Sequence, residues 1–541
     1  MKRLTPAMEQ YLKIKEGCKD AILFFRMGDF YEMFFEDAKL AAGILGIALT
    51  SRDKGRNIPM CGIPYHSVSP YIAKLVKEGH KVALCEQMED PKDADGVVER
   101  GVVRVITPGT AIEDELLEVK ANNYIAAATL NGKKAGFAYM DITTGEFRVT
   151  ELEGLQALKD EILRIGPSEL LLPEGADISK GGAEDAILLV KNTTYLDSYD
   201  FYDNTSLERM REHFEVSSLD GFGLKDFSEG LSAAGALLFY AKKTQKNAIR
   251  HIKRCSPYWT GNFLVMDHST RRNLEIFENA RTLGKEGTLL SLLDRTRTPM
   301  GGRKLKNWLL FPLLDTKEIE KRLLSVEELL EKRVERREVE RVLSSIHDME
   351  RLSGKVSIGV CGPKDLVSLR ESLERTNELK ERLGNFSSVL LVDINRRLDC
   401  VPEAASLIEA SLKADPPHTI KDGGFMKEGF SGELDALREL AGGGKEWIAR
   451  LESEERKRTR INTLKVGYNR VFGYYIEVTN PNLKNIPSDY IRKQTLANAE
   501  RFVTPELKEW ELKILNAEEK ARALEGNLFR ELTEEVSRKT G

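Results

Sequence analysis

The spacing of hydrophobic residues over positions 1–112 predicts a small α/β domain. Short apolar runs at 21–25, 81–86 and 97–106 have the length of buried strands, whereas the apolar residues of 34–45 recur at helical intervals. Strand-length runs that alternate with helices are typical of α/β domains.

A second α/β domain is predicted over residues 118–250. Two apolar runs flank Asn131-Gly132, a dipeptide that favours a two-residue hairpin because both turn positions require positive φ. A third strand over 146–150 follows a Thr-Thr-Gly turn, and the apolar runs at 170–172 and 187–190 predict further strands.

From about residue 255 to 430 the spacing becomes helical and predicts a body of packed amphipathic helices. Apolar residues there recur largely at three- and four-residue steps between charged residues. The stripe consists of Leu323, Val326, Leu330, Val334, Val342, Ile346 and Met349. Asp415-Pro416-Pro417 predicts an interruption, and Gly442-Gly443-Gly444 predicts a loop or kink further on.

A small β insertion between two long helices is predicted over residues 463–503. Residues 474–479 alternate with a period of two, which is a strand pattern. A last helix over 504–541 begins at Thr504-Pro505-Glu506, where a capping hydroxyl precedes a proline and an acid. Since a helix rises about 1.5 Å per residue, some 30 residues would hold the insertion roughly 45 Å from the helical body.

Composition indicates a soluble, reduced protein of several domains. The 541 residues exceed one compact domain, and the six widely spaced cysteines, without a C-x-x-C pair, argue against a disulfide framework or a zinc site. No apolar run could span a bilayer and the N-terminus lacks a signal-peptide core, so we expect no membrane association and a cytoplasmic location. With a net charge of -4, any contact with nucleic acid must come from local basic patches.

No catalytic motif stands out in the sequence. H-E-x-x-H, G-x-S-x-G and G-x-x-x-x-G-K-[ST] are absent, and the glycine-rich segment 441–446 lacks the Ser or Thr that a phosphate-binding loop needs after its lysine. Asp141 and Glu146 lie on neighbouring predicted strands, so a metal-dependent nuclease site is an alternative interpretation of this pair. Two such acids without further partners are more often solvated or hairpin residues.

Residues 26–34, with the sequence R-M-G-D-F-Y-E-M-F, allow two interpretations. One is a turn followed by the start of a helix with core aromatics. The other is a wedge, because an exposed aromatic at a glycine turn, here Phe30, can push between bases from the minor groove. Glu32 could then accept or share a proton with a base edge, since a carboxylate is tolerated near phosphates only where it makes a specific contact.

Basic residues gather around the predicted β insertion. Between positions 456 and 470 there are six basic residues and no acid. A solvated helix face is one explanation, and we favour the other, a surface that binds DNA phosphates without reading sequence. The candidate backbone-binding residues of this pattern are Arg456, Arg458, Arg460, Arg470, Arg492, Lys493 and Arg501.

Several long motifs resemble those of the MutS family of DNA mismatch-repair proteins, in the family's order and over essentially the whole chain. The motifs resembling its mismatch-binding domain are F-R-M-G-D-F-Y-E (25–32), I-P-M-C-G-I-P-Y-H (58–66), C-E-Q (85–87) and R-V-I-T-P-G-T (104–110). Those resembling its helical core and clamp are T-P-M-G-G-R (298–303), L-K-V-G-Y-N (464–469), G-Y-Y-I (473–476) and T-L-A-N-A-E-R (495–501).

The resemblance implies a multidomain fold, α/β in its first part and all-α in its second. The expected parts are a mismatch-binding α/β domain (1–112), an RNase H-like connector (118–250), a long-helix core or lever (255–430), a small β clamp with its flanking arm (431–503) and the returning lever helix (504–541).

The resemblance also implies that the partner is mismatched double-stranded DNA, kinked at mispairs or small insertion/deletion loops. Phe30 would stack on the mispaired base, Glu32 would hydrogen-bond to it, and Met60 would lie near this wedge. Asn469 and Asn498 would contact the backbone from the clamp. The family further implies a homodimer in the bacterial cytoplasm, associated with the nucleoid, that becomes an ATP-dependent sliding clamp and signals to MutL.

The family's nucleotide-binding domain follows the helical core, whereas this sequence stops at Gly541 without a phosphate-binding loop. We therefore expect a truncated chain that is not an enzyme and has no cofactor of its own. ATP and Mg²⁺ would belong to the full-length protein.

Three alternatives compete with this interpretation. The first is a MutS-like paralogue with a role at other DNA structures, but such paralogues lack the Phe30–Glu32 pair. The second is an RNase H-like nuclease, which a metal-dependent nicking assay would reveal. The third is a purely structural helical scaffold, against which the first domain and the basic insertion both argue.

Overall fold

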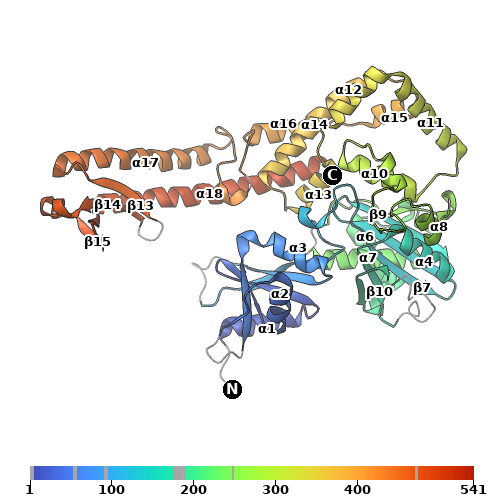
Figure 1. Cartoon of the computed structure of the whole chain (residues 1–541), viewed down its shortest axis with the longest axis horizontal. Helices are drawn as coiled ribbons and strands as arrows, with labels where there is room; N and C mark the ends of the chain where they lie inside the picture. The colour runs from blue at the N-terminus through green and yellow to red at the C-terminus, as the bar shows by residue number, and fades with distance from the viewer. Residues whose placement is uncertain are drawn as a thin grey trace. The chain divides into compact units, whose positions relative to one another are not determined.

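The computed structural model describes residues 5–52, 58–89, 96–175, 187, 189–245, 249–417, 419–469 and 473–540. The chain divides into two compact units. Unit 1 comprises Met1–Val360, Glu371–Cys400 and Thr540–Gly541, and unit 2 comprises Cys361–Arg370 and Val401–Lys539. The predicted architecture of two α/β domains, a helical region and a small antiparallel sheet between two long helices is confirmed (Figure 1).

A six-stranded sheet in the order β3-β4-β2-β1-β5-β6 forms the first α/β domain. Its strands are β1 (Ala21–Met27), β2 (Phe30–Phe34), β3 (Thr50–Ser51), β4 (Pro59–Pro64), β5 (Lys81–Gln87) and β6 (Arg100–Ile106), and its helices are α1 (Pro6–Glu16), α2 (Phe35–Leu45) and α3 (Ser69–Lys77). β1 and β5 are parallel, and the other neighbours are antiparallel. α2 and α3 contribute to the core on one face of the sheet, and α1 contributes to a smaller core on the other face.

The second α/β domain has a six-stranded sheet in the order β11-β10-β7-β8-β9-β12. Its strands are β7 (Ile125–Asn131), β8 (Lys134–Asp141), β9 (Glu146–Glu153), β10 (Glu169–Pro173), β11 (Thr193–Leu196) and β12 (Ser256–Pro257), and its helices are α4 (Gly154–Ile165), α6 (Asp203–Phe214) and α7 (Glu229–Thr244). α6 and α7 pack on one face and α4 on the other. α7 approaches β8 so closely that an added Cβ at Gly136 would lie 2.0 Å from the carbonyl oxygen of Glu229, so only glycine fits there.

Two predictions for the second domain are wrong in detail. The hairpin between β7 and β8 forms, but its turn is Gly132-Lys133, because Asn131 still pairs with Lys134 as the last residue of β7. Gly132 alone supplies the positive φ, at +62°. No strand forms at the described residues of 187–190, where Ile187 is helical and residue 188 lies outside the described residues. The edge strand of the sheet is β11 instead.

Helices make up the rest of unit 1. They are α8 (His268–Asn273), α9 (Leu289–Leu293), α10 (Pro299–Leu310), α11 (Thr316–Glu331), α12 (Arg333–Leu343), α13 (Met349–Ile358), α15 (Val389–Arg397) and the second part of α14 (Pro363–Leu383).

The predicted apolar stripe of this region faces a core only in its second half. Ile346 is 7% exposed, but Val334 is 73% exposed. The other exposed members of the stripe are Leu323, Val326 and Leu330. α11 turns Glu328 inward, and its carboxylate accepts hydrogen bonds from the backbone N–H groups of Ser387 and Ser388 at the start of α15. The side of α11 that carries Glu328 and Leu329 therefore faces α15, and the exposed leucines lie elsewhere on the helix.

Two long helices, α17 (Gly432–Thr459) and α18 (Pro505–Thr540), lie side by side in unit 2 (Figure 1). An ion pair of 2.7 Å between Arg438 and Glu525 and a stacked pair of rings, Trp447 and Trp510, join them. Between them the chain forms four antiparallel strands in the order β13-β14-β16-β15, here called the tip sheet. The strands are β13 (Lys465–Asn469), β14 (Gly473–Thr479), β15 (Ile491–Thr495) and β16 (Ala499–Val503), and α16 (Pro402–Ser411) precedes α17.

The break predicted at Gly442-Gly443-Gly444 does not occur, because α17 continues through these residues. A helical glycine costs about 1 kcal/mol relative to alanine. The helix has compensating contacts, since Ser431 caps its first turn by accepting a hydrogen bond from the N–H of Leu434, and Leu434, Ala441 and Ile448 are buried.

Short 3-10 helices complete the connections. They are η1 (Tyr65–Ser67), η2 (Asp114–Leu116), η3 (Ser198–Phe201), η4 (Asp220–Phe222), η5 (Thr260–Asn262), η6 (Ile420–Asp422) and η7 (Asn480–Asn485). All six cysteines are buried free thiols, as the sequence predicted. In the described part of the chain, no helix is both long and apolar enough to cross a bilayer.

Candidate nucleic-acid interface

A tight hairpin joins β1 to β2 and presents an aromatic ring to solvent. Its turn is Gly28-Asp29, with Met27 paired to Phe30 across it, and Gly28 has a φ of +56°, which favours glycine. The carbonyl of Asp29 accepts a hydrogen bond of 3.0 Å from the N–H of Tyr65, which holds the turn in place. Phe30 is 46% exposed. The helix start that one interpretation placed here is wrong, because β2 is a strand.

Alternation along β2 sends its side chains to two different faces of the sheet. Tyr31 and Met33 are buried in the core formed with α2 and α3. Phe30 and Glu32 lie on the opposite face, which α1 covers near Phe34. The period of two therefore brings an aromatic ring and a carboxylate together on an open part of the sheet.

The carboxylate of Glu32 is partly buried and has one ionic partner. Arg52 Nη1 lies 2.8 Å from Glu32 Oε2. Burial raises the pKa of Glu32 above its ordinary value, whereas the charge and hydrogen bond of Arg52, and the charge of Arg100, act against this rise. A raised pKa makes the carboxyl group easier to protonate, and a protonated carboxyl can donate a hydrogen bond as well as accept one.

β4 pairs with β2, so alternate residues of β4 share the face of Phe30 and Glu32. Gly62 lies opposite Glu32, and Pro64 lies opposite Phe30. Met60, the residue that the family resemblance placed near the wedge, is one further step along the same face and packs partly into the core under α1. The immediate neighbours of the pair on β4 are therefore a glycine and a proline.

Two contributors to this surface, Arg52 and Gly62, were not predicted from the sequence. Gly62 stands inside the I-P-M-C-G-I-P-Y-H motif, which was a signal that could have identified it. Arg52 is twenty positions from Glu32 and approaches it only through the folding of the sheet, so nothing in the local pattern pointed to the pair.

Arg26 supports the hairpin from behind. Its guanidinium carbon lies 3.4 Å from the centroid of the Tyr65 ring, and its Nη1 lies 3.6 Å from a carboxylate oxygen of Glu86. The carbonyl of Arg26 accepts a hydrogen bond of 2.7 Å from Arg100. These contacts join the base of the hairpin that carries Phe30 to η1, β5 and β6.

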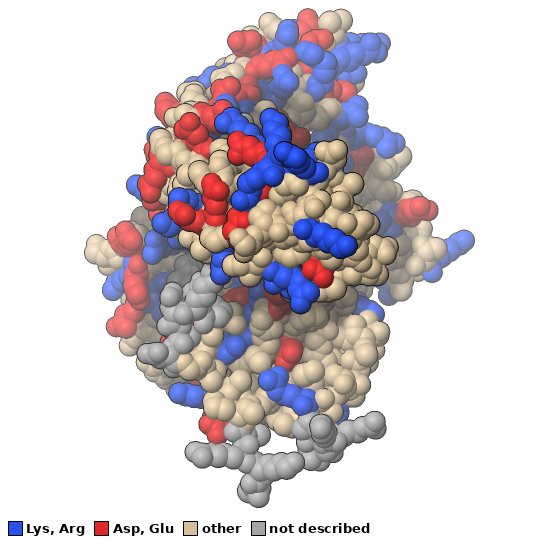
Figure 2. All heavy atoms as spheres, turned by 90° about the vertical axis from the view of Figure 1, so that its left-hand side faces the viewer, with Lys and Arg blue, Asp and Glu red and all other residues tan. Residues whose placement is uncertain are grey.

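Most arginines predicted to bind the DNA backbone are paired with carboxylates in unit 2. Both terminal nitrogens of Arg458 donate to Asp489 Oδ2 at 3.0 Å, and Arg458 also contacts Glu455. The other pairs are Arg456–Glu452 at 2.7 Å, Arg492–Glu500 at 3.3 Å and Arg501–Glu477 at 3.0 Å. Figure 2 shows red acidic side chains among the blue basic ones. The sequence suggested a more uniformly basic surface than the fold presents.

Four exposed cations near the tip sheet make no ion pair with a described residue. They are Lys457, Arg460, Lys465 and Lys484. Arg460 ends α17 in the left-handed conformation, with a φ of +56°. Lys457, Arg460 and Lys465 belong to the basic run between positions 456 and 470, and only Arg460 was among the candidate residues named from the sequence. Lys484 lies outside that run.

The remaining predicted backbone contacts lie at the edges and turns of the tip sheet. Asn469 pairs with Gly473 at the end of the β13–β14 hairpin. Lys493, in β15, and Asn498, in the turn before β16, are exposed. Arg470 lies outside the described residues.

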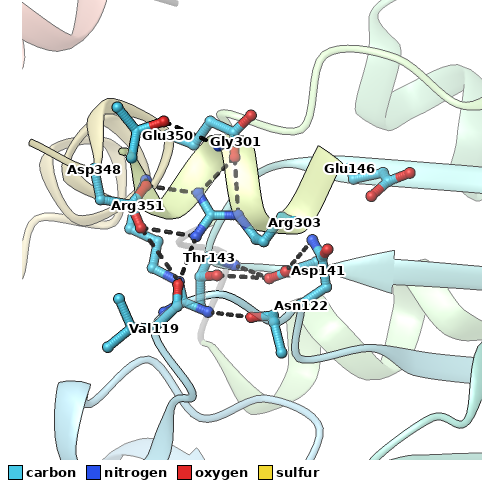
Figure 3. Close-up of polar contacts among 12 residues, drawn as sticks. Val119, Asn122, Asp141, Thr143, Glu146, Gly301, Arg303, Asp348, Glu350 and Arg351 are labelled. Carbon is cyan, nitrogen blue, oxygen red and sulfur yellow. Dashed lines mark hydrogen bonds and ion pairs between the residues drawn. The ribbon is translucent and has the colours of Figure 1, made fainter. Parts of the chain in front are cut away.

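The two acids that suggested a nuclease site have structural partners instead (Figure 3). Asp141 is fully buried, and its carboxylate accepts hydrogen bonds from Asn122, from the backbone of Asn123, and from both the backbone and the hydroxyl of Thr143. Glu146 points away from it and accepts a hydrogen bond from the Tyr124 hydroxyl at 2.8 Å. Within the described residues, no three His, Cys, Asp or Glu side chains are grouped so that they could hold a metal ion.

Asp141 stands beside a junction between the second α/β domain and two helices of unit 1, α10 and α13 (Figure 3). Arg303 forms a bidentate pair with Asp348, at 2.6 and 2.7 Å, and Arg351 donates a hydrogen bond of 2.6 Å to the carbonyl of Ala121. These contacts give the acids and arginines of this region a structural role.

Sequence profiles of known domains match almost the whole chain. The profile of MutS domain I matches residues 5–115, and that of MutS domain II matches residues 123–253. The profile of MutS domain III matches residues 269–541, just over half of the 541 residues. The chain belongs to the MutS family. The hairpin with Phe30 and Glu32 therefore lies in MutS domain I, and the tip sheet lies in MutS domain III.

Curated relatives are similar over nearly all of this chain. Proteins named DNA mismatch repair protein MutS from Lachnoclostridium phytofermentans, Symbiobacterium thermophilum and Caldanaerobacter subterraneus are 45%, 44% and 46% identical to it over 99%, 99% and 98% of its length. The chain covers 58%, 62% and 62% of these relatives, so it spans about 60% of the length of the MutS proteins it matches.

Proposed function

We propose that this chain recognises mismatched duplex DNA, with Phe30 as a wedge and Glu32 as the contact to a base. The observation that carries the proposal is the exposed ring of Phe30 beside the carboxylate of Glu32, on a hairpin fixed by Gly28 in MutS domain I. The relatives are named as mismatch repair proteins, which supports the same function.

The wedge discriminates through deformability of the DNA. Insertion of an apolar side chain kinks the duplex and unstacks a base step, which costs a few kcal/mol. A mispair has already lost part of its pairing and stacking, so the same deformation costs less there. Stacking of an aromatic ring on a base contributes about 1–3 kcal/mol, which corresponds to a preference of about 5- to 150-fold.

Glu32 adds a polar contact that discriminates against ordinary duplex. A carboxylate close to phosphates is repelled, so it weakens binding wherever it finds no partner on a base. Its raised pKa allows it to share a proton with a base edge, which turns the repulsion into a hydrogen bond at a mispair. The acid therefore adds selectivity at the expense of general affinity.

The tip sheet supplies contacts to the DNA backbone that are independent of sequence. Lys457, Arg460, Lys465 and Lys484 are the cations best placed for this role, because they are exposed and carry no competing carboxylate among the described residues. Phosphate contacts fix the position of a protein on a duplex, whereas base contacts give selectivity.

For the full-length protein we also infer the partners and cofactors of MutS proteins. These are a second copy of the protein, MutL, ATP and Mg²⁺. The similarity to MutS relatives supports these proposals. The 541 residues contain no G-x-x-x-x-G-K-[ST] segment, so they do not fit ATP.

Competition binding tests the proposal. The parent chain, Phe30→Ala and Leu40→Ala would each be titrated with a fluorescent duplex carrying one mispair and with the matched duplex, at one fixed salt concentration. Leu40 is a matched control, because it is 43% exposed in the same domain but lies on α2. We expect Phe30→Ala to remove most of the mismatch preference and to keep binding to matched DNA, and Leu40→Ala to behave as the parent. The proposal would be overturned if the parent showed no preference for the mismatched duplex. It would also be overturned if Phe30→Ala lost affinity equally for both duplexes.

A further inference from the structure

Gly62 occupies the strand position directly opposite Glu32, on the face that carries Phe30. A Cβ built on Gly62 would lie 3.7 Å from Glu32 Cγ and 3.8 Å from Phe30 Cδ1, with the carbonyl oxygen of Tyr31 at 3.5 Å. The residue therefore borders both side chains of the proposed mismatch site at van der Waals distance. Gly62 itself is exposed.

The backbone does not require glycine at this position. Gly62 is not among the residues with positive φ, and all three distances are ordinary contacts, so alanine fits without displacement of its neighbours. Glycine in the interior of a strand weakens the strand, because it has no side chain to pack and more freedom to lose on folding. Because neither the backbone conformation nor close packing requires glycine at position 62, the presence of glycine there needs another explanation.

We propose that Gly62 is a specificity-determining residue that keeps open the space between the Phe30 ring and the Glu32 carboxylate, so that one base edge can enter it. A side chain larger than alanine would project from β4 between these two groups and cover both. Pro64, opposite Phe30, borders the other end of this space with a rigid ring. The inference rests on the proposed function, since it assigns to Gly62 the admission of the base that Phe30 and Glu32 contact.

A β-branched side chain at position 62 should act on stability and on binding in opposite directions. Valine favours strands, and on this face it would pack against Phe30 and Glu32 as a cross-strand neighbour, so the free protein should become more stable. The same contact would hold the Phe30 ring against the sheet and fill the space beside the Glu32 side chain. A residue with only a structural role would lose stability and binding together.

The test is a size series, Gly62→Ala and Gly62→Val, with Gly43→Val as control. Gly43 has open space around its added Cβ and lies on α2, away from the proposed site. Each variant would be measured for its thermal unfolding midpoint and for its affinity for mismatched and matched duplexes. We expect Gly62→Val to unfold at a higher temperature than the parent, to lose about tenfold or more in mismatch affinity, and to bind matched DNA within about twofold of the parent. Gly62→Ala should retain most of the preference, and Gly43→Val all of it.

The outcomes separate this inference from the proposed function. If the parent shows no mismatch preference, the proposed function fails, and this inference fails with it. If the parent discriminates and Gly62→Val discriminates equally well, the inference alone is wrong. If Gly62→Val lowers the unfolding temperature and weakens binding to both duplexes equally, Gly62 has only a structural role and the inference is again overturned.

Discussion

The division of the basic residues near the tip sheet into paired and unpaired cations leads to a quantitative prediction. Removal of one phosphate contact should reduce the slope of log K against log salt by about 0.9. If Lys457, Arg460 and Lys465 each contact a phosphate, replacing all three with alanine should reduce that slope by about 2.7. Between about 50 and 200 mM salt, these contacts would account for roughly a 40-fold change in affinity.

The matched control is the triple variant Arg456→Ala, Arg458→Ala and Arg501→Ala. It removes the same formal charge, but each of these arginines already contacts a carboxylate. Its effect on the salt slope should be small, because these arginines neutralise carboxylates of the protein and not phosphates, so their removal changes no counterion release from the DNA. It should instead lower stability, with each exposed pair contributing about 0.2–1 kcal/mol.

Salt titrations of both triple variants on one matched duplex, followed by fluorescence anisotropy, measure the two slopes. The stacked pair of Trp447 and Trp510 provides an intrinsic signal for the integrity of α17 and α18 in the same samples. An equal or larger slope change in the paired set would refute this reasoning, because the ion pairs would then open on binding. An unchanged slope in the unpaired set would show that this surface is only a solvated helix face.

Three further predictions concern the first two domains. Because burial holds the pKa of Glu32 above its ordinary value, its contribution to stability is fully present below that ordinary value and is lost as the pH rises through the folded pKa. Glu32→Gln should therefore unfold at a higher temperature than the parent at about pH 7, and at the same temperature as the parent at about pH 3.5. If calorimetry at about pH 7 shows the parent unfolding at the higher temperature, this prediction is wrong. Arg52→Ala removes the main group that lowers the pKa of Glu32, so an NMR titration should show that pKa still higher, and an unchanged or lower value would exclude the ion pair. Asp141→Ala leaves buried donors unpaired and should cost about 1–3 kcal/mol or more in urea unfolding without altering the mismatch preference. An unchanged midpoint would refute the structural role of Asp141.

Local patterns in the sequence predicted the elements that depend on neighbours along the chain. The alternation of Tyr474, Ile476 and Val478 with their neighbours gave β14, and the Thr504 cap gave the start of α18. The sequence pattern also singled out Phe30 and Glu32 as a possible wedge. Such features need only the strand period or one capping hydrogen bond, and both are local.

The predictions that were wrong or missing depend on residues far apart in the sequence. The side of α11 that faces α15 carries Glu328, which accepts a hydrogen bond from Ser388 sixty positions away, so the spacing of the leucines alone did not identify the buried side. The pairing of Arg458 with Asp489 spans 31 residues, so a run of basic residues gave no sign of the carboxylates that would face it. The role of Gly62 depends on the β2–β4 register, which the hydrophobic pattern alone does not set.

The central claim is that the ring of Phe30 stacks on a mispaired base, and photocrosslinking tests it most directly. A duplex with 5-iodouracil in a single mispair would be irradiated in complex with the chain, and the adduct would be mapped by mass spectrometry, with the same base in a matched pair as control. We expect one dominant adduct, on Phe30, that forms with the mispaired duplex and not with the matched one. Adducts confined to other residues, or equal yields on Phe30 from both duplexes, would contradict it.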